Sequence, residues 1–360
     1  MGLHELTLRN FRLFDEYQFR PDHTSVTVFL SPNGTGKSSV LEAVYALATA
    51  GSFRTSSAAD MVRAGESVAE VHGVLFHQDR RVQVDLTLTR GARSTQKRML
   101  INGLRPQSRA DLAEALPLTV FTPEGVDVIR HGPEQRRDFL NHVMNDVDPK
   151  TSPLLERFTR VLSQRNAVLR RIQERRATPG EREELEVWTT DLASTGLELV
   201  GEREALLAQL DPLVNQYYRA LADDGQPVAL GYDRSWSGDL LDALHVAFDD
   251  DVARGHSTKG PHRDDILITL NHRDARRQAS QGEQRSLALA LRLAGHELIQ
   301  QRRGVDPLLL LDDVFSELDP VRSDRLLALL PVGQTLVTTA MPLPTKMKPA
   351  SIIDLATGRA

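Results

Sequence analysis

A glycine-rich loop between an apolar strand and an apolar helix constrains this chain more than any other feature. Residues 26–30 (Val-Thr-Val-Phe-Leu) predict a buried strand, and residues 40–48 predict a mostly buried helix. The loop at 31–38 ends in Gly36-Lys37-Ser38, the last three positions of the phosphate-loop pattern, with Ser31 at its first glycine. The order strand, loop, helix predicts an α/β fold with a phosphate site at the N-terminus of the helix.

Each part of this phosphate loop (residues 31–38) has a predicted role. Backbone N–H groups are expected to cradle the β- and γ-phosphates of a nucleotide, and Gly34 and Gly36 allow the close approach. Lys37 would neutralise the phosphates, and Ser38 would ligate Mg²⁺. A glycine-rich turn without a ligand is the alternative, which the flanking strand and helix disfavour. The predicted cofactor-binding residues are Ser31, Pro32, Asn33, Gly34, Thr35, Gly36, Lys37, Ser38 and Ser39.

A second apolar strand carries two acidic residues at its end. Residues 307–311 predict a central parallel strand, and Asp312 and Asp313 follow it at the edge where α/β sheets bind ligands. We expect Asp312 to hold Mg²⁺, directly or through water, and Asp313 to polarise an attacking water. Asp313 and Lys37 are thus the predicted catalytic residues, and Ser38 and Asp312 the predicted metal ligands. Acids that merely end a strand are the alternative.

A capped helix precedes the acidic strand. Ser280 is placed as its N-cap, and Gly282 allows a phosphate to approach the free N–H groups of the first turn. Alone, this pattern is typical of an ordinary buried helix. Between a phosphate loop and an acidic strand, it is typical of the signature segment of an ABC-type ATPase. The predicted signature residues are Ser280, Gln281, Gly282, Glu283 and Gln284.

Composition narrows the class of protein. The chain has 360 residues, a net charge of −5 and no cysteine, which excludes disulfides, thiolate zinc sites and iron–sulfur clusters. Its longest aliphatic run, residues 308–311, is too short to span a bilayer, and its start has no signal-peptide pattern. We therefore expect a cytoplasmic protein with no membrane contact. No histidine spacing predicts a metal site apart from nucleotide-bound Mg²⁺.

The middle of the chain predicts an inserted helical hairpin. Helical patterns run over 134–176 and 181–221, with Pro179 and Gly180 near the turn. The two ends of the chain carry the motifs and together are expected to form a head of two lobes. The predicted domains are a discontinuous head, 1–130 plus 250–360, and a helical arm, 131–249.

With its three motifs the chain resembles the RecF family of ABC-type DNA-repair ATPases. The resemblance implies an α/β fold: an ABC-type P-loop ATPase head of mixed sheets with flanking helices, similar to SMC heads, with an inserted α-helical arm. Further segments that carry it are Leu8-Arg9-Asn10-Phe11-Arg12, Leu41-Glu42-Ala43, Ser52-Phe53-Arg54, Phe121-Thr122-Pro123-Glu124, Pro133-Glu134-Gln135-Arg136-Arg137-Asp138-Phe139-Leu140, Gly260-Pro261-His262-Arg263-Asp264-Asp265 and Val314-Phe315-Ser316-Glu317-Leu318-Asp319.

The resemblance also implies an ATP-dependent homodimer with ATP and Mg²⁺ as cofactors. Each ATP would lie between the phosphate loop and Asp312 of one copy and the signature segment (residues 280–284) of the other. Asp313 and Gln281 stand where many ABC ATPases have glutamate and glycine, and both fit slow hydrolysis that acts as a switch. The expected activity is that of a weak ATPase stimulated by DNA. ABC transporters have a histidine after the corresponding strand, where this chain has Thr338 and Thr339. We expect one of these to sense the γ-phosphate, with a buried sheet threonine as the alternative.

The implied function is recombinational repair. The dimer would clamp duplex DNA near single-strand gaps and at duplex–single-strand junctions, and would help to load RecA with RecR and RecO. Roles in replication restart and the SOS response follow. The alternative is an ABC-type ATPase subunit of another system, an SMC-like structural head or a transporter motor. The long insertion and the missing histidine oppose a transporter, and the short arm opposes a structural head.

A local excess of basic residues predicts where DNA binds. Residues 80–109 are strongly basic although the whole chain is acidic, and such a surface holds DNA phosphates without reading bases. A solvated strand face is the alternative. The predicted DNA-binding residues are Arg80, Arg81, Arg90, Arg93, Lys97 and Arg98.

Overall fold

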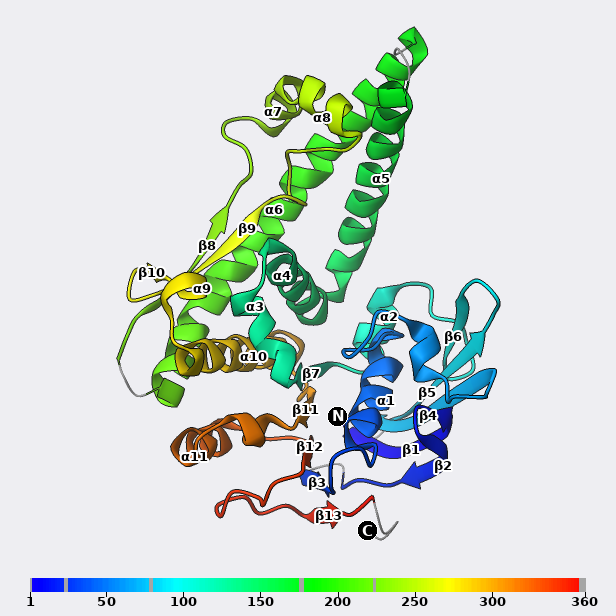
Figure 1. Cartoon of the computed structure of the whole chain (residues 1–360), viewed down its shortest axis with the longest axis vertical. Coiled ribbons are helices and arrows are strands. Elements are labelled where there is room, and N and C mark those ends of the chain that lie inside the picture. The colour runs from blue at the N-terminus through cyan, green and yellow to red at the C-terminus, as the bar shows by residue number, and fades with distance from the viewer. Residues whose placement is uncertain (1, 23–24, 78–79, 175–177, 223–224, 356–360) are drawn as a thin grey trace.

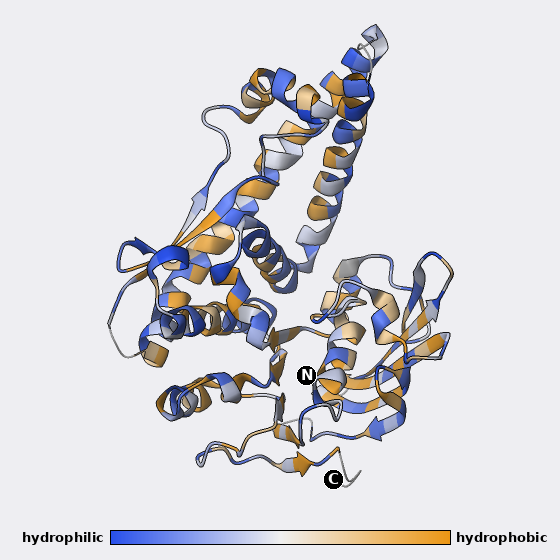
Figure 2. Cartoon of the chain, in the orientation of Figure 1, coloured by the Kyte–Doolittle hydropathy of each residue, from blue (hydrophilic) through white to orange (hydrophobic). Residues whose placement is uncertain are grey.

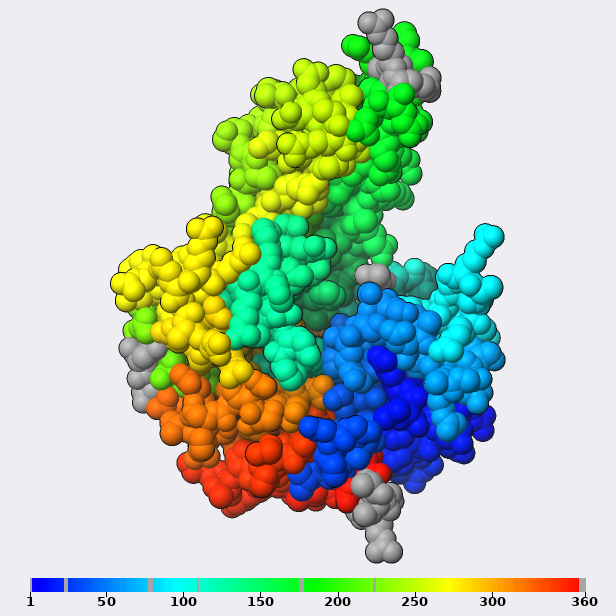
Figure 3. Space-filling model, in the orientation of Figure 1, coloured from blue at the N-terminus to red at the C-terminus, as the bar shows by residue number. Residues whose placement is uncertain are grey.

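The computed structural model describes residues 2–22, 25–77, 80–174, 178–222 and 225–355. Its sheets and most of its helices form a head, from which two long helices project as an arm (Figure 1). The space-filling view shows the far end of the arm projecting beyond the head, with its base packed against the head (Figure 3). In the part of the chain described, no helix has the length and apolar character needed to cross a membrane.

A parallel sheet carries the site. Its strands lie in the order β13-β3-β12-β11-β7, so the first and last parts of the chain meet in it. Their bounds are β3 (Val26–Leu30), β7 (Leu118–Phe121), β11 (Leu308–Asp312), β12 (Thr335–Thr339) and β13 (Ser351–Ile353).

Both faces of the parallel sheet are covered, which explains its continuous apolar strands. Leu308 and Leu310 of β11 face a core that includes α1 (Lys37–Thr49). Leu309 and Leu311 face the opposite core, with α10 (Gln281–Arg303). The strand and helix predicted around the phosphate loop are both present.

An antiparallel sheet packs on the α1 side, with strand order β2-β1-β4-β5-β6. One face is apolar and buried against α1, and the other is polar. The hydropathy colouring shows orange and blue alternating along these strands (Figure 2). The bounds are β1 (Gly2–Phe11), β2 (Phe14–Phe19), β4 (Val68–His77), β5 (Arg80–Arg90) and β6 (Thr95–Ile101).

The arm consists of α5 (Ser152–Glu174) and α6 (Pro179–Ala222). The single helix expected over 134–176 is wrong, because α4 (Pro133–Val147) ends before a short 3₁₀ turn, Pro149–Thr151. Proline has no N–H to continue a helix, and Asp148 caps the turn. Residue 177 of the expected hairpin turn lies outside the described residues. α6 runs from the arm into the head, where it packs on α10.

Shorter elements complete the structure. β8 and β9 lie on either side of residue 249 but pair in one small sheet, so the predicted domain boundary there stays a prediction. The remaining bounds are α2 (Arg109–Ala115), α3 (Asp127–Arg130), α7 (Leu240–Val246), α8 (Phe248–Arg254), α9 (Ala275–Gln278), α11 (Pro320–Leu329), β8 (Val228–Asp233), β9 (Asp265–Leu270), β10 (Arg273–Asp274) and the 3₁₀ helices Ala58–Met61, Pro123–Val126 and Val314–Glu317.

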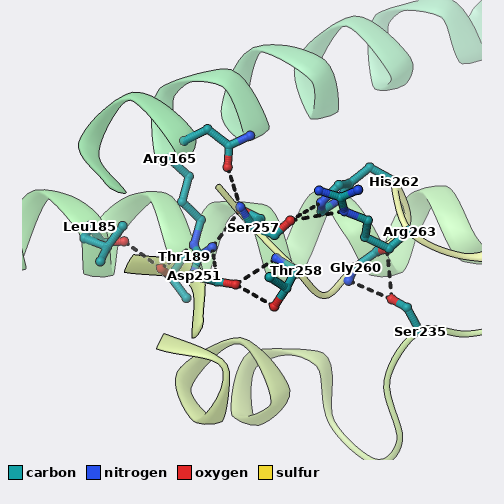
Figure 4. A network of polar contacts seen from close by, with 11 residues as sticks. Arg165, Leu185, Thr189, Ser235, Asp251, Ser257, Thr258, Gly260, His262 and Arg263 are labelled. Atoms are coloured by element: carbon teal, nitrogen blue, oxygen red, sulfur yellow. Dashed lines mark hydrogen bonds and ion pairs between the residues drawn. The ribbon is translucent and has the colours of Figure 1, made fainter. Parts of the chain in front are cut away.

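A buried polar network holds the arm together (Figure 4). Arg165 of α5 donates to Asp251 of α8 at 2.7 Å, to Thr189 of α6 at 3.0 Å and to Ser257 at 2.7 Å. Arg165 is 1% exposed and Asp251 0%. Thr258 donates from its N–H and its hydroxyl to the other Asp251 oxygen, each at 2.7 Å. Each buried charge is therefore matched by hydrogen bonds, as burial requires.

The segment 260–265, one of those that carry the family resemblance, is held in place by hydrogen bonds from neighbouring elements. Arg136 of α4 holds Asp265 with two hydrogen bonds, at 2.7 and 2.9 Å. Tyr232 donates to Asp264 at 2.7 Å. Burial lowers the pKa of His262 to about 4, and its Nε2 bonds to the Ser257 carbonyl at 3.0 Å. The His262 ring is therefore neutral at pH 7, and it is half-buried beside the Ser257 backbone.

Candidate nucleotide-binding site

Two glycines shape the phosphate loop. Gly34 and Gly36 have φ values of 86° and 97°, in the left-handed region that glycine adopts without strain. Gly36 is the N-cap of α1. A Cβ atom at Gly36 would also lie 2.8 Å from the ring of Phe14, so both conformation and space require glycine there.

Lys37 places a buried positive charge in the loop. Its ammonium donates to the carbonyls of Ser31 at 2.6 Å and Pro32 at 2.8 Å. Desolvation lowers the pKa of Lys37, while the nearby carboxylates of Asp313 and Asp312 act in the opposite direction. Within the described residues its hydrogen bonds go to these carbonyls and not to a carboxylate, so its charge is available to an anion.

Ser31 ties the loop to the C-terminal segment. Its hydroxyl donates to Asp354 Oδ1 at 2.7 Å and accepts from the N–H of Leu355 at 2.8 Å. These partners are more than 300 residues away, so the sequence carried no signal for them. Thr35 closes the loop by donating to the Pro32 carbonyl at 2.9 Å. The remaining predicted residues lie exposed (Asn33), half-buried (Ser38) and buried (Ser39).

The end of β11 brings the predicted metal ligands together. Burial raises the pKa of Asp312, and hydrogen bonds from Thr338 and Ser38 act against that rise. The Thr338 hydroxyl donates to Asp312 Oδ1 at 2.6 Å. Ser38 and Asp312, predicted from opposite ends of the chain, are therefore in contact. Carboxylate and hydroxyl oxygens are hard ligands of the kind that Mg²⁺ prefers.

Asp313 follows in a strained conformation. Its φ is 50°, a left-handed value that costs energy for a residue with a Cβ. Its N–H donates to the carbonyl and hydroxyl of Thr338, both at 3.0 Å, which holds this backbone in place. Its Oδ1 is buried and has no hydrogen-bond partner in the described part of the chain. An orphaned carboxylate oxygen beside Lys37 fits a site completed by a ligand or its water.

Thr338 lies beneath these acids. It is 0% exposed, and its hydroxyl is engaged with Asp312. Thr338 therefore positions the Asp312 carboxylate from inside the sheet. This matches the alternative given for it above, a buried threonine of the sheet. Thr339 is also buried, and its hydroxyl bonds to the backbone of Met341.

Glu42, a buried carboxylate of α1, was not among the site residues predicted from the sequence. Glu42 is 0% exposed and accepts from Arg12 Nε at 2.8 Å, from the Ser52 hydroxyl at 2.5 Å and from Arg54 Nη1 at 3.4 Å. Arg54 also donates to the Ser39 hydroxyl at 3.4 Å, and its positive charge acts against the rise in the pKa of Asp312 that burial causes. Three segments that marked the family thus meet at one point, next to the phosphate loop. The sequence showed these segments as family motifs, but it did not show that they meet at Glu42.

The signature segment is a capped helix start, as predicted. Ser280 Oγ accepts from the N–H of Glu283 at 3.3 Å, and Glu283 Oε2 accepts from the N–H of Ser280 at 2.6 Å. These bonds lower the pKa of Glu283. Gln284 is buried and accepts from Arg130 at 2.9 Å. Ser280 and Gln281 are exposed.

Within one chain the signature segment and the phosphate loop do not meet. α10 begins next to α9, on the opposite side of the head from α1 (Figure 1). The C-terminal end of α10 lies near α2, where Arg303 donates to the carbonyls of Ala113 at 2.9 Å and Glu114 at 3.2 Å. The exposed helix start therefore faces solvent in the single copy.

The six predicted DNA-binding residues do not share one face. Lys97 pairs with buried Leu88, and its ammonium donates to the Ala50 carbonyl at 2.7 Å. Arg90 donates to the carbonyls of Ala59 and Val62. Arg81 and Arg98 lie on the outer face of the antiparallel sheet, where acids such as Asp85 and Glu70 also lie. Arg80, Arg81, Arg93 and Arg98 are exposed.

Known proteins match nearly the whole chain. The RecF/RecN/SMC N terminal domain family matches residues 2–341. The DNA replication and repair protein RecF of Geobacter sulfurreducens is 37% identical over 340 residues, 92% of this chain and 90% of that protein. RecF of Streptomyces avermitilis is 36% identical over 353 residues, 94% of this chain and 93% of that protein.

Solved structures agree. The recombination mediator protein RecF-ATP in the RecFOR pathway has a TM-score of 0.88 at 26% identity, covering 98% of this chain and 94% of that chain. An Smc head bound to the C-winged helix domain of ScpA has a TM-score of 0.55 at 15% identity, covering 95% and 90%, and shows the shared fold. The expected ABC-type ATPase head with an inserted arm is confirmed. The chain belongs to the RecF family of DNA replication and repair proteins.

Proposed function

We propose that this chain binds ATP with Mg²⁺ at the phosphate loop and uses it to join two copies. The observation that carries the proposal is the buried Lys37 ammonium, whose hydrogen-bond partners among the described residues are carbonyls and which lies near Asp312 and Asp313. A cation with no carboxylate salt bridge, in a loop of exposed N–H groups at a helix start, suits a phosphate chain. A relative in the same family is described with ATP bound.

The proposed roles follow from the geometry. Ser38 and Asp312 would hold Mg²⁺, which when bound would neutralise phosphate charge. Asp313 would orient and polarise the attacking water through its free oxygen, while Thr338 holds its backbone. A short carboxylate on a rigid backbone suits slow hydrolysis, so the chain would act as a switch. DNA would stimulate that hydrolysis.

The second copy would complete the site. Ser280, Gln281 and Gly282 lie at an exposed helix start that the phosphate loop of the same chain does not reach. A second chain can place this start against the γ-phosphate, where free N–H groups and the helix dipole favour an anion. ATP then stabilises the dimer, and its hydrolysis releases it.

In the cell, the dimer would clamp duplex DNA near single-strand gaps and at duplex–single-strand junctions. It would help to load RecA with RecR and RecO, in the cytoplasm, and support replication restart and SOS induction. Membership of the RecF family supports this role, and a relative is described as a recombination mediator in the RecFOR pathway. Arg80, Arg81, Arg93 and Arg98 are exposed and able to meet phosphates.

Two variants test this function. Lys37→Ala should lose ATP binding in calorimetry, while Lys150→Ala, which removes an exposed lysine, should bind as the parent does. Ser280→Arg should bind ATP yet stay monomeric in light scattering with Mg²⁺ and duplex DNA. Unchanged affinity in Lys37→Ala, or a parent protein that stays monomeric at saturating ATP, would contradict the proposal.

A further inference from the structure

An arginine of α11 lies against the glycine of the signature segment. A Cβ atom placed on Gly282 would be 3.0 Å from Nη1, 3.1 Å from Nη2 and 3.2 Å from Cζ of Arg322. Gly282 has no left-handed φ, so its backbone does not itself demand glycine. The lack of a side chain at 282 instead leaves room for a guanidinium group over the first turn of α10.

The guanidinium is held from one side. Asp319 Oδ2 accepts from Arg322 Nη1 at 2.9 Å, and Asp319 Oδ1 accepts from the Arg322 N–H at 2.9 Å. Within the described residues, Nη2 and Nε donate no hydrogen bond. The Arg322 side chain is 32% exposed. The arginine is thus fixed in place while part of its donor set stays available.

The surrounding carboxylates already have partners. Glu283 accepts from the N–H of Ser280 at 2.6 Å and from Gln226 at 3.2 Å. Glu317 pairs with Arg285, which also donates to the Glu317 carbonyl at 3.0 Å. Asp319 caps α11. Arg322 is therefore a cation that lies directly against Gly282 and keeps open donors, next to the N–H groups of a helix start.

We propose that Arg322 binds the γ-phosphate of an ATP held by the other copy. This inference rests on the proposed sandwich dimer and assigns it one more residue. A guanidinium at the helix start adds charge-assisted hydrogen bonds that only a third phosphate reaches, so it favours ATP over ADP at the interface. Gly282 would then serve the approach of both the phosphate and Arg322, and Asp319 would set the direction of the guanidinium.

The first test compares Arg322→Ala, Arg322→Gln and Arg322→Lys with Arg277→Ala. Arg277 is exposed, pairs with Asp274 near the same helix start, and serves as the matched control. We expect Arg322→Ala to bind ATP in calorimetry as the parent does, but to need at least about tenfold more protein to dimerise with ATP in light scattering, the loss of about one charged hydrogen bond per site. Arg322→Gln, which preserves packing and a donor to Asp319, should show the same loss. Arg322→Lys should recover part of it.

The second test asks which copy supplies the arginine. Arg322→Ala holds ATP in its own loop, and Lys37→Ala offers an intact Arg322 but no nucleotide. At a protein concentration too low for Arg322→Ala to dimerise by itself, a mixture with excess Lys37→Ala should therefore recover ATP hydrolysis. An arginine acting within its own chain would give no recovery.

Several outcomes would overturn the inference. Parent-like dimerisation of Arg322→Ala would remove the role, and dimerisation at lower protein concentration would make Arg322 an obstacle to ATP instead. No recovery in the mixture would place the arginine in its own chain. If the parent binds ATP and dimerises, and the Arg322 variants dimerise as the parent does, this inference fails while the proposed function stands. If the parent does not dimerise, the proposed function fails and the inference falls with it.

Discussion

At the scale of single residues, Asp312 is the proposed Mg²⁺ ligand, and it is buried at the end of β11 although it would need a negative charge to hold a cation. Burial raises its pKa, and the hydroxyls of Thr338 and Ser38 act against that rise. Hydrogen bonds to the charged form favour it, so Thr338 preserves ionisation inside the sheet. The hydroxyl also spares a buried oxygen from being left without a donor.

Thr338→Val tests this role. Valine keeps the shape of the side chain and removes the donor at 2.6 Å, so the pKa of Asp312 should rise further. The ionised form is then lost at higher pH as the solution is acidified. We expect the acid limb of the pH profile of ATP hydrolysis to move to higher pH, and the Mg²⁺ concentration for half-maximal hydrolysis to increase.

Thr335→Val is the matched control, because Thr335 is a buried threonine of the same strand that pairs with Leu309 instead of Asp312. It should leave the acid limb where it is in the parent. A Thr338→Val profile that superimposes on the parent would show that Asp312 does not depend on this hydroxyl.

At the scale of elements, the arm depends on a buried ion pair. Arg165 joins α5 to α6 through Thr189 and to α8 through Asp251. Removing one partner of such a pair leaves an uncompensated buried charge, which costs about 3–5 kcal/mol. Exposed pairs between long side chains contribute about 1 kcal/mol or less.

Arg165→Ala should therefore lower the free energy of unfolding by about 3–5 kcal/mol in urea titration followed by circular dichroism. Arg157 lies on the same helix as Arg165 and forms an exposed pair with Glu198 of α6, so Arg157→Ala should cost about 1 kcal/mol or less. Equal losses in the two variants would mean that the network of Figure 4 does not stabilise the arm.

At the scale of the whole molecule, one amide connects the two large sheets. Gln334, before β12, accepts from the N–H of Leu3 at 2.7 Å and donates to the carbonyls of Leu3 at 2.8 Å and Asp22 at 2.9 Å. It is 1% exposed. Three backbone groups near the N-terminus thus depend on a side chain near the C-terminus.

Gln334→Leu should destabilise the head by about 3 kcal/mol, because it leaves buried backbone groups without partners. Gln301→Leu, at an exposed position of α10, is the control and should change stability by about 0.5 kcal/mol or less. Differential scanning calorimetry compares the two midpoints. A Gln334→Leu midpoint equal to that of the control would show that the sheets are held together without this amide.

The local features of the site could be predicted from the amino-acid sequence. The strand–loop–helix around Lys37, the acidic end of β11 and the cap at Ser280 each depend on residues a few positions apart. Apolar periodicity and side-chain caps act over such distances, so the amino-acid order determines them. Pro149 is also a local signal, because proline interrupts a helix. The helical patterns on both sides of it nevertheless led to the prediction of one continuous helix.

The tertiary structure alone decided which distant groups meet. Ser31 with Asp354, Glu42 with Arg12 and Arg54, and Arg322 over Gly282 are partners that no spacing along the chain implies. The faces taken by the basic strand residues likewise depended on the register of β5 and β6. Such contacts arise from how sheets and helices pack, because packing brings together side chains whose separation in sequence carries no periodic signal.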